Sequence, residues 1–139
     1  MNQEYQHSVE RKGEELLKAH YGDDYVKTER SQDVFDGIDC YIKGKPYDMK
    51  ASESGCLSVI RHTKNSGWYC PLVAHPDIDY LYIKDNTAYY IDRGMLLSNF
   101  AQLAPKLRWG TYNGDGNYQT WVDLSPVIKD LSYKEERLN

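Results

Sequence analysis

The stretch VFDGIDCYIKGKPYDMKA, residues 34–51, decides the fold that this sequence predicts. Residues 34–42 are rich in β-branched and aromatic side chains, which favour an extended strand, and residues 46–51 are interpreted as a second strand. Lys43-Gly44-Lys45 lies between them, and a glycine at this place favours a tight turn. We therefore expect these two segments to form an antiparallel hairpin.

The regions around this hairpin predict a mixed α/β (α+β) fold. Apolar residues recur at helical spacing over residues 4–20, and residues 78–83 and 87–91 flank Asp85-Asn86 as a second hairpin. The order helix, strand cluster, helix, strand in a chain of 139 residues fits one domain over residues 1–139. The remaining expectations are strands over 25–29, 56–61 and 118–124, a helix over 93–107 interrupted near Pro105, an irregular segment over 62–77, a loop over 109–117, and a short polar helix at the end of the chain.

Composition restricts the classes of function. Seventeen Lys and Arg against 21 Asp and Glu give a net charge of −4, so bulk positive charge does not drive any binding of nucleic acid. A 40% share of apolar residues is enough to bury a core. No apolar run approaches the roughly 20 residues of a membrane span, and the N-terminal segment is too polar for a signal peptide. We expect a cytoplasmic protein with no membrane partner.

Three cysteines, Cys40, Cys56 and Cys70, form no CxxC pair and cannot all pair with one another. This pattern indicates reduced thiols in a cytosolic protein. His62 and His75 lie near them in the sequence, but the spacings match no zinc finger or ribbon. Either histidine could serve as a general base, although a metal-bound water needs no histidine.

Two acids and a lysine lie on the expected hairpin. Asp48 and Lys50 are two residues apart, so both point to the same face of a strand. If Gly44-Lys45 is the turn, Asp39 lies opposite Lys50, Tyr41 lies opposite Asp48, and the two acids and the lysine share that face. Asp33 and Asp36 are interpreted as turn residues before the first strand.

Converging carboxylates repel each other unless a positive charge lies between them. A divalent cation with oxygen ligands, Mg²⁺ or Mn²⁺, would supply that charge, and the backbone carbonyl of Met49 is a further candidate ligand. Lys50 would position a water or stabilise developing charge. The alternative is a cross-strand salt bridge on a solvated surface. Because Asp is disfavoured in strands, the crowding of acids here favours a functional site.

The residues GID, with Asp39, and YDMK, with Asp48 and Lys50, resemble the PD-(D/E)XK nuclease superfamily. The match departs from the family pattern at Ile38, which stands where the pattern has proline. The resemblance extends over about residues 5–104, and its later part, Gly67-Trp68 followed by residues 77–100, looks like small phage or bacterial members. It implies a restriction-endonuclease-like core, a central mixed β-sheet flanked by helices, in a bacterial or phage-infected cell.

The resemblance also implies an acid from the first helix, where VERKGEELL is similar to the family's helix. Glu10 lies at the edge of the apolar stripe and is the preferred residue, with Glu14 as the alternative. The expected metal ligands are then Glu10, Asp39, Asp48 and the Met49 carbonyl, with Lys50 assisting the attacking water.

The function that follows is a Mg²⁺- or Mn²⁺-dependent endonuclease that hydrolyses phosphodiester bonds, with DNA as the expected partner. A homodimer would allow such a small enzyme to cut both strands. The alternative is an inactive, nuclease-like binding or anti-defence protein that recognises another protein or nucleic acid. The candidate substrate-binding residues are basic or polar and lie in the hairpin or among aromatic rings: Lys43, Lys45, Ser52, Arg61, Lys64 and Arg108.

Overall fold

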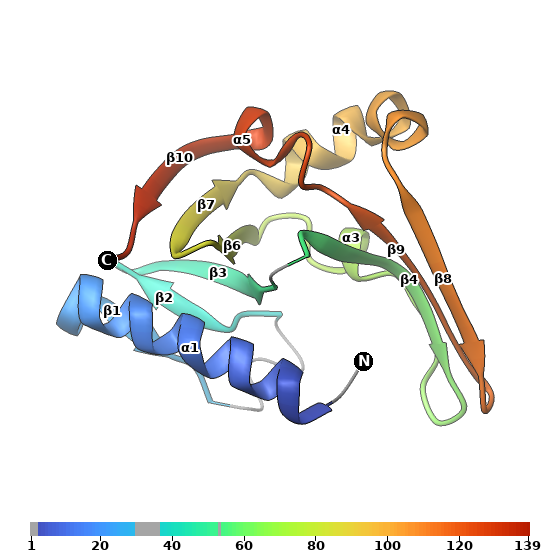
Figure 1. The fold of residues 1–139 in the computed structure, drawn as a ribbon, viewed down its shortest axis with the longest axis horizontal. Helices are drawn as coiled ribbons and strands as arrows, with labels where there is room; N and C mark the ends of the chain where they lie inside the picture. Colours follow the sequence, from blue (N-terminus) through green and yellow to red (C-terminus); the bar gives the residue numbers. More distant parts are fainter. Residues whose placement is uncertain (1–2, 30–36, 53) are drawn as a thin grey trace.

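The computed structural model describes residues 3–29, 37–52 and 54–139, and for residues 3–7 the backbone alone. Asp33, Asp36 and the first part of the predicted strand over 34–42 lie outside the described residues. The described chain is a mixed α+β fold with one six-stranded and one four-stranded sheet (Figure 1). Its elements in order are α1 (Gln3–Tyr21), η1 (Gly22–Asp24), β1 (Tyr25–Lys27), β2 (Cys40–Ile42), β3 (Lys45–Ala51), β4 (Cys56–Thr63), β5 (Gly67–Tyr69), α3 (Pro71–Ala74), β6 (Asp79–Lys84), β7 (Thr87–Ile91), α4 (Arg93–Leu103), η2 (Ala104–Lys106), β8 (Trp109–Gly114), β9 (Asn117–Asp123), α5 (Ile128–Leu131) and β10 (Ser132–Arg137).

The larger sheet contains both parallel and antiparallel strand pairs. Its strand order is β1-β2-β3-β6-β7-β10. Strands β3 and β6 run parallel, and the other neighbours are antiparallel. A parallel pair needs a long crossover connection, and here the chain leaves through β4, β5 and α3 before it returns as β6. Strand β3 therefore lies near the middle of the sheet.

The smaller sheet, with strand order β5-β4-β9-β8, extends from the body as an arm (Figure 1). Two expectations were wrong here: part of the segment 62–77 forms β5, and most of the expected loop 109–117 forms β8. The turn between β8 and β9 is only Asp115-Gly116, with φ of 55° and 79°. A two-residue turn of this conformation matches the twist of its flanking strands. Asn113, Gly114 and Asn117 therefore still pair between β8 and β9.

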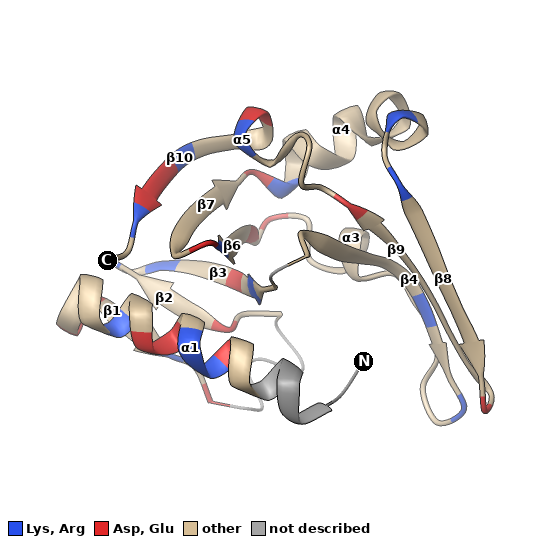
Figure 2. Cartoon of the chain, in the orientation of Figure 1, with Lys and Arg blue, Asp and Glu red and all other residues tan. Residues whose placement is uncertain are grey.

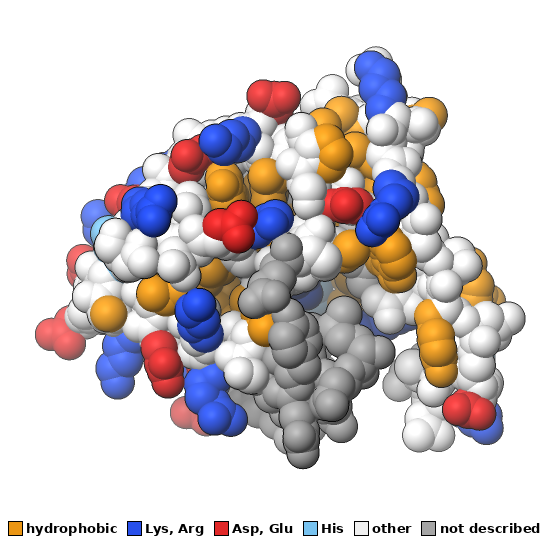
Figure 3. Space-filling model, in the orientation of Figure 1, with side chains coloured by type: hydrophobic (Ala, Val, Ile, Leu, Met, Phe, Trp, Pro, Cys, Tyr) orange, Lys and Arg blue, Asp and Glu red, His pale blue; other side chains and the backbone are white. Residues whose placement is uncertain are grey.

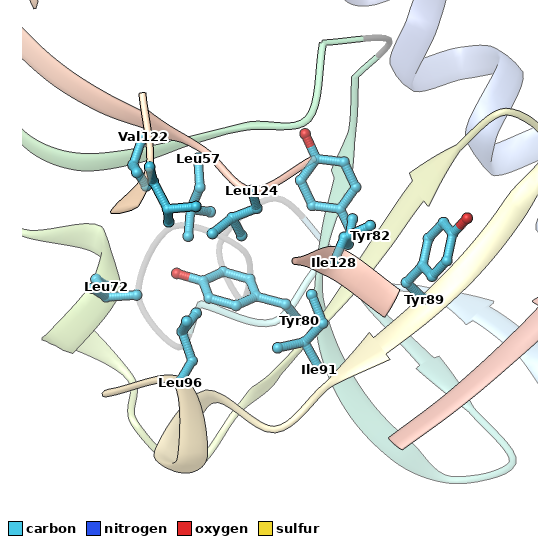
Figure 4. Close-up of a cluster of buried hydrophobic side chains, with 11 residues drawn as sticks. Leu57, Leu72, Tyr80, Tyr82, Tyr89, Ile91, Leu96, Val122, Leu124 and Ile128 are labelled. Atoms are coloured by element: carbon cyan, nitrogen blue, oxygen red, sulfur yellow. The ribbon is translucent and has the colours of Figure 1, made fainter. Parts of the chain in front are cut away.

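The two faces of the six-stranded sheet pack against different partners because side chains alternate along each strand. Tyr47, Ala51 and Leu81 join Leu17 of α1 in one core cluster. A Cβ at Gly13 would lie 3.3 Å from the Cβ of Ala51, so this glycine lets α1 approach the sheet closely. The opposite face packs against the second sheet, α3, α4 and α5 (Figure 4), and its buried cluster contains Leu57, Leu72, Tyr80, Tyr82, Tyr89, Ile91, Leu96, Leu107, Val122, Leu124 and Ile128.

The end of the chain adds a strand where the sequence predicted a polar helix. Helix α5 ends at Leu131, and β10 then pairs antiparallel with β7. Tyr21 at the end of α1 hydrogen-bonds to Tyr90 of β7 and to Glu136 of β10. Leu138 follows β10 and is buried in the core cluster under α1. The last strand is thus part of the main sheet and its core.

The three cysteines form no disulfide, and Cys40 is buried. None of the helices in the described residues is long and apolar enough to cross a membrane.

Removing the buried side chain after β10 tests whether this strand stabilises the fold. We expect Leu138→Ala to lower the free energy of unfolding by about 2–3 kcal/mol, because it leaves a cavity under α1. Arg137→Ala, at the exposed neighbouring position, should change it by less than about 0.5 kcal/mol. Urea unfolding followed by circular dichroism measures both. Equal effects of the two variants would show that the segment contributes no core packing.

Candidate functional site at the ends of β2 and β3

The turn between β2 and β3 differs from the predicted one. Lys43 and Gly44 occupy the turn, both with positive φ, and Ile42 pairs with Lys45. Tyr41 therefore pairs with Pro46, and the prediction that it lies opposite Asp48 was wrong by two residues. The two possible turns both contain Gly44, and a lysine on either side of this glycine leaves the choice open from sequence.

Asp39 lies just before β2, beside the backbone of β3. Cys40 pairs with Tyr47, so the next residue pair in this register is Asp39 with Asp48. The prediction that Asp39 lies opposite Lys50 was therefore wrong. The Asp39 amide donates to the Tyr47 carbonyl at 2.8 Å, and Asp39 Oδ2 accepts from the Met49 amide at 2.7 Å. The carboxylate is thus held against the backbone between the other two motif residues.

Asp48 lies between two cations. Its Oδ1 is 3.2 Å from Lys50 Nζ, and its Oδ2 accepts from Arg93 Nη2 at 2.7 Å. Side-chain exposure is 13% for Asp48 and 38% for Lys50, so the lysine is the member of this pair that solvent reaches. Figure 2 shows the acidic and basic positions side by side at the end of β3. The sequence predicted a positive charge next to the acids, and Lys50 and Arg93 supply part of it at Asp48.

Arg93 is the residue at this site that sequence reasoning missed. It is wholly buried at the start of α4, where Asp92 caps the helix by accepting from the Met95 amide. Its Nη1 donates to the Pro71 carbonyl at 3.1 Å, and its guanidinium carbon lies 4.0 Å from the centre of the Tyr80 ring. An arginine directly after a helix-capping aspartate is an ordinary sequence signal. Only its pairing with Asp48, 45 residues away, distinguishes it.

Three carboxylates act on the buried thiol of Cys40. Burial is the largest cause that raises the pKa of Cys40 to about 12, and the negative charges of Asp39, Asp48 and Glu14 contribute to this rise. Glu14 also pairs with Lys27 of β1 at 3.1 Å. The charge of Glu14, the alternative candidate on α1, thus acts on Cys40 and Lys27 at this part of the sheet.

Glu10 is exposed on α1. This helix covers the face of β3 that carries Tyr47 and Ala51, whereas Asp48 and Lys50 belong to the opposite face. Within the described residues, no group of three or more His, Cys, Asp or Glu is placed to hold a metal ion. The role of Glu10 as a ligand stays a prediction.

The donor set of the remaining acids suits a hard divalent cation. Mg²⁺ keeps several of its own waters and is commonly bound by one or two carboxylates. Asp39, just before β2, and Asp48 of β3 are two such carboxylates, and the Met49 amide donates to Asp39. The residues that would hold Mg²⁺ or Mn²⁺ are therefore Asp39 and Asp48, with the Met49 carbonyl as a further candidate.

The three substrate-binding candidates nearest the motif have different surroundings. Lys43 is exposed in the turn. Lys45 is engaged by Asp79 at 2.9 Å and by the Tyr133 hydroxyl at 3.0 Å. Ser52 directly follows β3 and hydrogen-bonds to Ser54 at 2.8 Å. Because Lys45 lies three positions before Asp48 on the same strand, alternation directs it to the opposite face.

The other three candidates lie on the arm, away from β3. Arg61 of β4 lies over the ring of Tyr69, and Lys64 follows β4 in the turn to β5. Arg108 precedes β8 and lies over Trp121. Figure 3 shows basic and hydrophobic side chains distributed along this arm. Arg61 lies within β4, as the strand predicted over 56–61 implies, and β4 extends beyond that prediction to Thr63.

Comparison with protein-family models, with curated proteins and with solved structures finds no match to this chain.

A double-mutant cycle tests the coupling between Asp48 and Arg93. We expect Arg93→Met and Asp48→Asn each to lower the free energy of unfolding by about 3 kcal/mol, because the first leaves the part-buried Asp48 without its arginine and the second leaves the buried Arg93 without its carboxylate. The double variant should lose much less than the sum. Urea unfolding measures all three.

The matched control for this cycle is Arg108→Met. Arg108 is 73% exposed and lies 4.0 Å from Asp123, so we expect a change below about 1 kcal/mol. Additive effects of Arg93→Met and Asp48→Asn would contradict the proposed coupling.

Proposed function

We propose that this protein is a metal-dependent nuclease that hydrolyses phosphodiester bonds in DNA. The observation that supports it is the meeting of the motif residues at one point: the Asp39 carboxylate binds the Met49 amide at 2.7 Å, and Asp48 and Lys50, on either side of Met49, contact each other at 3.2 Å. Two acids and a solvent-accessible lysine at one place form a donor set suited to hydrolysis of a phosphodiester.

We also propose a restriction-endonuclease-like core for the six-stranded sheet. The mixed pairing of its strands and the helices on both faces support this assignment. The four-stranded arm is an addition to such a core that the sequence did not predict.

Each motif residue would contribute differently to hydrolysis. When bound, Mg²⁺ or Mn²⁺ would lower the pKa of a coordinated water and neutralise charge at phosphorus. Asp39 and Asp48 supply the oxygen donors. Lys50 reaches solvent next to Asp48, so its ammonium group can bind a phosphate oxygen or orient the attacking water. Arg93 is a positioning residue, because it fixes Asp48 from the buried side and does not reach solvent.

The arm supplies the residues that would contact DNA beyond the scissile bond. Arg61, Lys64 and Arg108 lie among the exposed rings of Trp68, Tyr69 and Tyr112. Basic side chains interleaved with exposed aromatic rings are typical of surfaces that bind phosphates and stack on bases. The low overall charge makes such local contacts the basis of binding.

A second candidate function is supported by the ion pairs of Asp48. Both of its oxygens are engaged by protein cations, Arg93 and Lys50, so its charge is already balanced without a metal. This arrangement favours a nuclease-like protein without catalytic activity that binds another protein or nucleic acid. The two candidates differ in one measurable property, metal-dependent cleavage.

Cleavage assays separate these functions. We expect plasmid, single-stranded or branched DNA to be cut in Mg²⁺ or Mn²⁺ and not in EDTA. Asp39→Asn and Lys50→Ala should each reduce the rate about 100-fold or more, because one removes a metal ligand and the other a charge-stabilising donor. Rates are measured at saturating metal.

Lys129→Ala is the matched control, since Lys129 is an exposed lysine of α5 outside the site. Its rate should equal that of the unmodified protein. Metal-dependent cleavage that survives both site substitutions would show that the site is wrongly assigned. No cleavage of any DNA or RNA substrate would favour the binding protein.

A further inference from the structure

Strand β8 leaves a long sheet edge without a partner. Among the strands that the structure describes, its only neighbour is β9. In Figure 1, β8 runs along the outer side of the arm, and no labelled element lies beyond it. Its six residues, WGTYNG, contain no charge and no proline, and its ladder with β9 has no bulge. Such an edge is a ready template for pairing with another strand.

The other sheet edges in the described residues are protected in ways that β8 is not. Strands β1 and β5 have three residues each, which is too short for an extended new ladder. Strand β10 has an irregular register and four charged residues in succession, Lys134, Glu135, Glu136 and Arg137. Short strands, charges and bulges are the usual protection against edge pairing. Among the sheet edges formed by the described strands, β8 is therefore the one without such protection.

The backbone groups that point outward from β8 can be assigned from its ladder. Gly114 and Asn117 close the two-residue turn and form a hydrogen-bonded pair. At the other end, Asp123 N donates to Arg108 O at 2.9 Å. Because bonded and non-bonded pairs alternate, even-numbered residues from 108 to 114 bond to β9. The amides and carbonyls of Trp109, Thr111 and Asn113 therefore point away from the sheet.

We propose that β8 pairs antiparallel with β8 of a second copy of this chain, forming a dimer with one continuous eight-stranded sheet across the two arms. Thr111 would lie opposite Thr111 of the second copy, and Trp109 opposite Asn113. This register pairs every outward-pointing residue of one strand with one of the other, so a two-fold axis satisfies both edges at once.

The charges at the two ends of β8 fit this arrangement. Arg108 lies directly before the strand and Asp115 directly after it, and both are exposed. Antiparallel pairing brings each arginine toward the aspartate of the other copy, whereas parallel pairing would bring like charges together. An unrelated extended peptide would not, in general, carry this complementary pattern. The occupant that fits the edge is therefore the same strand.

The side chains of the strand are also self-complementary. In this register, Tyr112 lies opposite Gly110 of the second copy. Gly110 has no side chain, and the Trp121 ring lies over it. A Cβ added at Gly110 would lie 1.9 Å from an atom of this ring. The exposed Tyr112 ring would pack beside this indole, since opposed residues and their neighbours share a face. The two-fold axis produces this aromatic contact twice.

Substitutions at Thr111 test the pairing without changing the ladder to β9. Thr111→Pro removes an outward amide, and an edge strand tolerates proline where the amide faces solvent. Thr111→Val keeps the amide and is the matched control. Light scattering over about a hundredfold range of protein concentration should show the unmodified chain and Thr111→Val reaching twice 16.2 kDa. Thr111→Pro should raise the dimer dissociation constant at least about tenfold.

A charge on the edge supplies a second test. Tyr112→Lys should also weaken the dimer, because two lysines would then lie close to the same axis. Val26→Lys on the edge of β1 is its control, since Val26 is 53% exposed and Tyr112 is 56% exposed.

In the unmodified chain, hydrogen exchange should slow at the backbone amides of Trp109, Thr111 and Asn113 as the protein concentration rises. This measurement needs no variant.

Three results would overturn the proposal. They are a mass of 16.2 kDa at every concentration, equal dissociation constants for Thr111→Pro and Thr111→Val, or exchange at these three amides that does not depend on concentration. The proposal does not rest on nuclease activity, because the measurements contain no metal and no nucleic acid.

Discussion

The guanidinium of Arg93 is wholly buried, and a buried guanidinium needs a carboxylate beside it to offset its loss of solvent. Asp48 meets this requirement from the middle of β3, and the Pro71 carbonyl and the Tyr80 ring complete the surroundings. The ion pair thereby links β3 to the start of α4 and to α3. The same bond also determines which way the central acid of the candidate site points.

The position of this ion pair follows from the two-sided packing of the six-stranded sheet. One face of β3 is apolar and packs under α1, while the other carries Asp48 and Lys50 toward α4 and the arm. The charged residues can share the second face with a core because Arg93 neutralises Asp48 from the buried side and Lys50 reaches solvent. The arm then extends beyond this site and carries the basic and aromatic residues proposed to contact DNA.

Elements that depend on local signals were predicted well from sequence. Helix α1 and the β6–β7 hairpin follow from helical spacing and from Asp85-Asn86, whose positive φ values fit a two-residue turn. Strand β8 was missed because its Gly and Asn residues resemble a loop, and β10 because its charged sequence resembles an exposed helix. Both are strands because a neighbouring strand supplies the hydrogen bonds, and that neighbour is not visible in a local window.

The sequence by itself indicated a hairpin that brings Asp39 beside the strand of Asp48 and Lys50, because spacing and a glycine-containing turn are local properties. It also determined the alternation that places Asp48 and Lys50 on one face. Only the tertiary structure decided the register of that hairpin, the pairing of Asp48 with Arg93, and the assembly of the arm from segments about 60 residues apart. These features depend on contacts between distant parts of the chain, which local preference does not specify.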